Sequence, residues 1–98
     1  MKIGLPKEVK NNEFRVGLTP DSVGGLSLNH DVFVEKNAGK AIGFTDEMYQ
    51  ANGAQILKDA SSVFDESDLI VKVKEPLPEE NQFLSSKHTL FTLSLIHI

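Results

Sequence analysis

The chain has 98 residues, a formal net charge of −4 and no cysteine, and 40% of its residues are hydrophobic. This length accommodates one small domain, and the apolar content argues against intrinsic disorder. The acidic balance without any basic run excludes nucleic acid and anionic membranes as main partners, and the missing cysteines exclude disulfides and thiolate metal sites. Neither a signal peptide nor a membrane-spanning apolar run is visible, so we expect a cytoplasmic protein. We also expect no metal centre.

The N-terminal third predicts a strand, a helix and a second strand. Residues 2–6 are mostly apolar, too short for a helix and closed by a proline, which indicates a strand. A helix is predicted over 20–28, because Thr19 is a good N-cap and the proline after it suits the first helical position. Asn29 then follows as a candidate left-handed cap. The alternating segment 31–35 predicts the second strand.

The rest of the chain continues the alternation of helices and strands. Side-chain caps predict helices over 45–51 and 59–67, and a shorter helix is expected over 79–84. Residues 37–43 contain two glycines and are interpreted as a connection, since their spacing does not match a phosphate-binding loop. Such alternation predicts right-handed crossovers between parallel strands.

Three further strands complete the predicted sheet, over 54–57, 69–74 and 89–98. The segment 69–74 begins with a continuous apolar run, so we expect it to be the central strand. The predicted fold class is α/β, with a three-layer, Rossmann-like (flavodoxin-like), mostly parallel sheet. The Gly-x-Gly-x-x-Gly dinucleotide fingerprint is absent, so the spacing gives no reason to place NAD on these residues.

Two cations are expected at the carboxyl edge of this sheet, where open α/β sheets bind ligands. Arg15 lies in the loop after the first strand, and Lys74 ends the strand over 69–74. A guanidinium binds a carboxylate with two parallel hydrogen bonds, while an ammonium can reach a carbonyl, and a 2-oxo acid presents both groups. On the residues alone, both cations are more often solvated or paired, with Glu13 and Glu75 as ready partners. Lys72 is interpreted as support for the end of the strand.

A motif near the N-terminus identifies a family. Its pattern is Gly-apolar-Pro-x-Glu, then Asn-Glu, Arg-Val, and Thr-Pro with a valine three positions on. The matching residues are Gly4, Pro6, Glu8, Asn12, Glu13, Arg15, Val16, Thr19, Pro20 and Val23. This pattern closely resembles the N-terminal signature of the alanine dehydrogenase and pyridine-nucleotide transhydrogenase family. The segment 72–76, Lys-Val-Lys-Glu-Pro, resembles the alanine dehydrogenase branch. The resemblance covers nearly all of residues 1–92.

The resemblance implies a function that composition and spacing alone do not. It implies an NAD-dependent enzyme that oxidatively deaminates L-alanine to pyruvate and ammonia. It also implies that Arg15 and Lys74 contact the carboxylate and the carbonyl of the substrate. NAD would be bound by a second domain that this chain lacks, and full-length relatives would be homo-oligomers. Residues 1–92 are then an incomplete N-terminal substrate domain, expected to be inactive alone.

The family's catalytic histidine has no counterpart at the matching position. Relatives place this general acid and base three residues after a threonine, where Leu95 stands here. His97 lies two residues farther on, which displaces it by roughly 6–7 Å along a strand. We therefore expect no working catalytic histidine, and we interpret 93–98 as a tail foreign to the family. His30 and His88 are expected to be surface or turn residues, because no second ligand or base stands at useful spacing.

Two other functions remain open at this point. The chain could be the N-terminal part of an NAD(P) transhydrogenase alpha subunit, although the sequence Lys74-Glu75 argues against that branch. It could also be a stand-alone module that binds a small carboxylate. Binding of a carboxylate without NAD would distinguish such a module from part of an enzyme.

Overall fold

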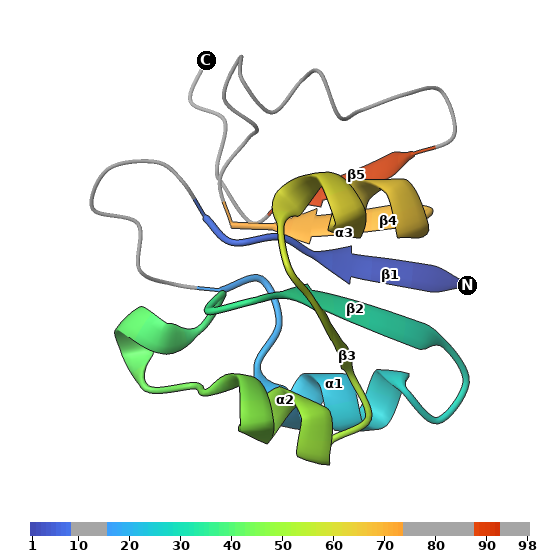
Figure 1. The fold of residues 1–98 in the computed structure, drawn as a ribbon. Coiled ribbons are helices and arrows are strands. Elements are labelled where there is room, and N and C mark those ends of the chain that lie inside the picture. The colour runs from blue at the N-terminus through green and yellow to red at the C-terminus, as the bar shows by residue number, and fades with distance from the viewer. Residues whose placement is uncertain (9–15, 74–87, 93–98) are drawn as a thin grey trace, which may run out of the picture.

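A computed structural model of the chain describes residues 1–8, 16–73 and 88–92 (Figure 1). Its strands are β1 (Lys2–Leu5), β2 (Asp31–Glu35), β3 (Gln55–Leu57), β4 (Leu69–Lys72) and β5 (Thr89–Thr92). Its helices are α1 (Pro20–Leu26), α2 (Asp46–Ala51) and α3 (Ala60–Glu66), with a 3₁₀ turn, η1, over Lys40–Ile42. The helix expected over 79–84 and the end of the strand expected over 89–98 lie outside the described residues. Within the described part, no helix is long and apolar enough to cross a membrane.

The strands form one parallel sheet in the order β3-β2-β1-β4-β5. Of the two common doubly wound orders, this is the Rossmann order. The expectation that the strand beginning at Leu69 is central was wrong, because β1 holds that place. The chain builds outward from β1 to β3 and then crosses to the other side of β1 to form β4. Residues Ile70 and Val71 of β4 are nevertheless buried, since β1 and β5 flank them.

Helices cover both faces of the sheet, as the three-layer prediction requires. In Figure 1, α1 and α2 lie on one side of the strands and α3 on the other. Val23 of α1 and Tyr49 of α2 belong to the same buried cluster as Ile3 and Leu5 of β1. Gly4 faces the opposite way, where an added Cβ would lie 2.9 Å from Val63 Cγ1 of α3. The small residue at this position lets α3 pack directly on the central strand.

The predicted helix starts are confirmed by their caps. Thr19 Oγ1 accepts a hydrogen bond from the Ser22 amide, and Asp59 Oδ1 accepts one from the Ser62 amide. Thr45 caps α2 in the same way. Each of these bonds satisfies an amide that has no partner within its helix. Local chemistry therefore fixes where the helices begin.

The predicted left-handed conformation of Asn29 was wrong. Helix α1 ends at Leu26, and the amides of Asn29 and His30 both donate to the Leu26 carbonyl oxygen, at 3.2 and 3.0 Å. That carbonyl is satisfied without a left-handed residue. Among the described residues other than glycine, only Asn37 has a positive φ, of 65°. It follows β2, where its amide donates to Asp46 Oδ1 at 2.8 Å.

Candidate functional site

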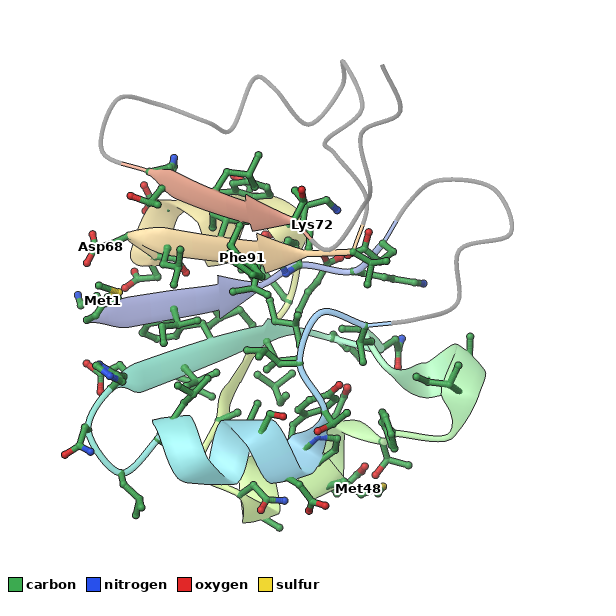
Figure 2. All side chains as sticks on the ribbon, turned by 180° about the vertical axis from the view of Figure 1, so that it is seen from behind. Met1, Met48, Asp68, Lys72 and Phe91 are labelled. Atoms are coloured by element: carbon green, nitrogen blue, oxygen red, sulfur yellow. The ribbon has the colours of Figure 1, made fainter. Side chains whose placement is uncertain are left out.

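The carboxyl ends of β1 and β4 meet at the topological switch point of the sheet. After β1 the chain proceeds toward β3, whereas β4 lies on the other side of β1, so the connections after the two strands diverge. Such a divergence opens a crevice in which α/β proteins bind ligands. Figure 2 shows Lys72 at the arrowhead of β4, whereas Met1 and Asp68 lie at the opposite edge of the sheet. The site predicted from the sequence belongs to this edge.

The predicted site residues follow these two strands directly. Arg15 lies in the connection after β1, and Lys74 lies two residues beyond the end of β4. Both lie outside the described residues, as does His97. The structure instead describes what joins the ends of β1 and β4.

A buried ion pair joins the ends of β1 and β4. Lys72 Nζ lies 3.4 Å from Glu8 Oε1, and the two side chains are 1% and 3% exposed. The second carboxylate oxygen of Glu8 accepts a hydrogen bond of 3.0 Å from the amide of Val73. Charged side chains are almost never buried this completely unless they are paired. Glu8 therefore contacts Lys72, the last residue of β4, and Val73, the residue immediately before Lys74.

Sequence reasoning recognised Lys72 as strand-end support but assigned Glu8 only to the family pattern. The signal for their pairing was weak, because the two residues are 64 positions apart. A lysine at the end of a buried strand does, however, require a nearby carboxylate. Glu8, directly after the neighbouring strand, is placed to supply it.

A second carboxylate lies beside this pair, at the end of β2. Glu35 Oε1 accepts a hydrogen bond of 2.9 Å from the Lys7 amide. Burial raises the pKa of Glu35 above its usual value of 4.5, and this effect is opposed by the Lys7 amide and by the charges of Lys7 and Lys72. The edge of the sheet thus brings together acidic and basic groups from β2, β4 and the connection after β1.

The connection that carries Arg15 returns to the sheet beside β4. A Cβ added to Gly17 would lie 2.8 Å from Val71 Cγ1 and 3.1 Å from the Val71 carbonyl oxygen. The backbone two residues after Arg15 therefore lies against the backbone three residues before Lys74. Glycine permits this close approach because it has no side chain.

The two described histidines lie at the amino edge of the sheet, away from the switch point. His30 precedes β2, and its Nδ1 lies 3.3 Å from the terminal amine of Met1. His88 precedes β5, and its Nε2 lies 2.6 Å from the Phe64 carbonyl oxygen. Its ring also packs edge to face on the ring of Phe64. Both side chains are half-buried rather than fully exposed, and their contacts are structural.

The described residues do not fit a metal or a dinucleotide. Among them, no group of three or more histidine, aspartate and glutamate side chains is placed to hold a metal ion. A dinucleotide site needs a glycine-rich turn after β1, so that backbone amides can approach the pyrophosphate. Here Pro6, Lys7 and the buried carboxylate of Glu8 follow β1. These three residues do not form such a glycine-rich turn.

Comparison with known proteins shows which family has this fold and this motif. Residues 4–97 match the family model described as "Alanine dehydrogenase/PNT, N-terminal domain". The chain belongs to this family. It is 50% identical over 93 residues to alanine dehydrogenases from Methanococcus maripaludis and Bacillus subtilis. These matches cover 94% of the chain but only 25% and 24% of the relatives, so the chain spans about a quarter of their length.

Solved structures of this family have the same fold. An L-alanine dehydrogenase superposes with a TM-score of 0.89 and 46% identity, over 94% of this chain and 26% of that one. A transhydrogenase from Sinorhizobium meliloti superposes with a TM-score of 0.86 and 29% identity, over 96% of this chain and 28% of that one. The alanine dehydrogenase is the better match, as the sequence of residues 72–76 indicates.

Proposed function

We propose that residues 1–92 are the N-terminal, substrate-binding part of an alanine dehydrogenase, which interconverts L-alanine with pyruvate and ammonia using NAD. The observation that carries this proposal is the contact between Gly17 and Val71 at the switch point. It puts the backbone of Gly17, two residues after Arg15, against β4, which ends two residues before Lys74. Convergence of these two cations is what a 2-oxo acid would require.

In this proposal Arg15 binds the substrate carboxylate and Lys74 binds its carbonyl oxygen. A planar guanidinium matches the two carboxylate oxygens and fixes the orientation of the substrate. A compact ammonium stabilises the negative charge that develops on the carbonyl oxygen as ammonia adds to the carbonyl carbon. NAD is assigned to a second domain, because the Gly-x-Gly-x-x-Gly fingerprint is absent from this sequence. His97 is assigned no catalytic role, because it lies two residues beyond the matching position.

The boundary at residue 92 and the foreign tail over 93–98 remain predictions, as do a cytoplasmic location and assembly of the full-length enzyme into a homo-oligomer. A transhydrogenase subunit is the second candidate, supported by the 29% identical structure. The higher identity to alanine dehydrogenases and the sequence Lys74-Glu75 favour the first.

A chimera tests this proposal. Residues 1–92 would replace the aligned region of Bacillus subtilis alanine dehydrogenase, whose remaining part follows unchanged. We expect this chimera to convert pyruvate and ammonia to L-alanine at the expense of NADH. Arg15→Lys and Lys74→Met should each raise the KM for pyruvate by at least tenfold, whereas Lys40→Met, at an exposed position on η1, should leave it unchanged. A folded chimera without activity, or with full activity in both site variants, would contradict the proposal.

A further inference from the structure

Glu8 reaches Lys72 and Val73 beyond the point where the β1–β4 ladder ends, whereas Lys72 is still paired with Thr92 of β5. The β1–β4 ladder pairs Ile3 with Leu69 and Gly4 with Ile70, and within the described residues it continues no farther. The Val73 amide lies beyond the last of these pairs and donates to Glu8 Oε2 instead. A side chain thus takes the place of a strand partner at the end of β4.

We propose that Glu8 is a positioning residue for substrate binding. By accepting a hydrogen bond from the Val73 amide, it fixes the backbone of the residue that precedes Lys74. This inference rests on the proposed role of Lys74. Lys72 has a separate part, because its ammonium holds the Glu8 carboxylate in place from the preceding residue. Together the two contacts fix the position and direction of the chain immediately before the substrate-binding lysine.

The energetics of the pair favour a role beyond stability. Removing two charges from water costs about as much as their attraction returns, so well-packed apolar residues of similar volume often stabilise a fold equally well. Apolar residues could therefore also join the ends of β1 and β4. They could not accept the hydrogen bond of the Val73 amide, which is buried and would lose its partner.

Positional accuracy at this point matters for binding. A misplacement of about 1 Å at a substrate-positioning group can cost on the order of a hundredfold in rate. Lys74 adjoins Val73 in the chain, so any shift of the Val73 backbone is passed on to its Cα. Loss of the hydrogen bond that the Val73 amide donates to Glu8 is therefore expected to raise the KM for pyruvate beyond any effect of lower global stability.

Two double variants in the chimera separate this role from a merely structural one. Glu8→Gln with Lys72→Met removes both charges but keeps an oxygen that can accept from the Val73 amide. Glu8→Leu with Lys72→Met also removes both charges, and it removes the acceptor as well. Neither double variant leaves a single buried charge of the ion pair behind, so both double variants are expected to fold. Lys2→Met with Glu66→Gln, at exposed positions away from the switch point, serves as the matched control.

We expect the double variant with Glu8→Gln, which keeps the acceptor but loses the ion pair, to raise the KM for pyruvate by no more than about threefold, whereas the control should leave it unchanged. Loss of the acceptor in the double variant with Glu8→Leu should raise that KM more than tenfold while kcat at saturating pyruvate changes less, and amide exchange at Val73 should accelerate. Equal KM values for the two site variants in an active chimera would overturn the role of Glu8 and leave the proposed function standing. An inactive parent chimera that is folded would overturn both.

Discussion

The phenol group of Tyr49 donates a hydrogen bond of 2.8 Å to the carbonyl oxygen of Leu18. This bond spans 31 residues and joins α2 to the segment that leads from the switch point into α1. The Tyr49 side chain is fully buried, and its ring packs edge to face on Phe44. Tyr49 thus anchors the segment just after Gly17, and Gly17 itself lies against β4.

Removing this hydroxyl should destabilise the domain without disturbing its packing. Tyr49→Phe keeps the ring but leaves the Leu18 carbonyl oxygen without this donor, which should lower the free energy of unfolding by about 1–2 kcal/mol. Urea denaturation followed by circular dichroism measures the change. Phe44→Leu removes the ring contact while the hydroxyl bond remains, and serves as the comparison. Unchanged stability in Tyr49→Phe would show that the hydroxyl contributes nothing net.

Ionisation of the buried Tyr49 phenol should lower the stability of the domain at alkaline pH. Burial, with a smaller contribution from Asp46, raises the pKa of Tyr49 from 10.0 to about 12. The folded state therefore holds this proton more tightly than the unfolded state. Stability is unaffected below pH 10 and declines as the pH rises toward 12, by roughly 2–3 kcal/mol in total. Tyr49→Phe should remove this part of the pH dependence, as denaturation at pH 9 and at pH 11.5 would reveal.

Burial of the charged Glu35 side chain should lower the stability of the domain at neutral pH. Because burial raises its pKa above 4.5, the folded state binds this proton more tightly than the unfolded state. The contribution of Glu35 to stability is therefore most favourable below pH 4.5 and is lost as the pH rises through its folded-state pKa.

The substitution Glu35→Gln keeps an acceptor for the Lys7 amide and removes the charge. It should stabilise the domain at pH 7 by less than about 1 kcal/mol, since the carboxylate is only half-buried. Thermal melts at pH 7 and pH 4 provide the test. The gain should vanish at the lower pH, and a variant less stable than the parent at pH 7 would contradict the assignment.

The ion pair between Glu8 and Lys72 should show strong coupling in stability. Glu8→Gln alone leaves the ammonium of Lys72 buried without this carboxylate, and Lys72→Met alone leaves the carboxylate without this ammonium. Each should lower the free energy of unfolding by about 3–5 kcal/mol, whereas the double variant should recover most of the loss. Urea denaturation of the four proteins forms a double-mutant cycle. Additive losses would mean that the two charges do not interact.

The chain by itself determined the local structure. Thr19, Thr45 and Asp59 predicted where the helices begin, because a cap depends only on residues within one turn. The apolar pattern of 31–35 located β2 at the same residues as the structure. The alternation of elements predicted a parallel α/β sheet, which the structure confirms. The site at its carboxyl edge stays a prediction.

Only the tertiary structure decided which distant residues meet. Whether Leu69 begins the central strand or a neighbouring one depends on the direction in which the chain crosses the sheet, and the strand's own residues do not specify it. The conformation of Asn29 was decided by hydrogen bonds to the Leu26 carbonyl rather than by its own propensity. The pairing of Glu8 with Lys72 needed β1 and β4 to be neighbours, since a burial environment is created by the packed sheet and not by either segment alone.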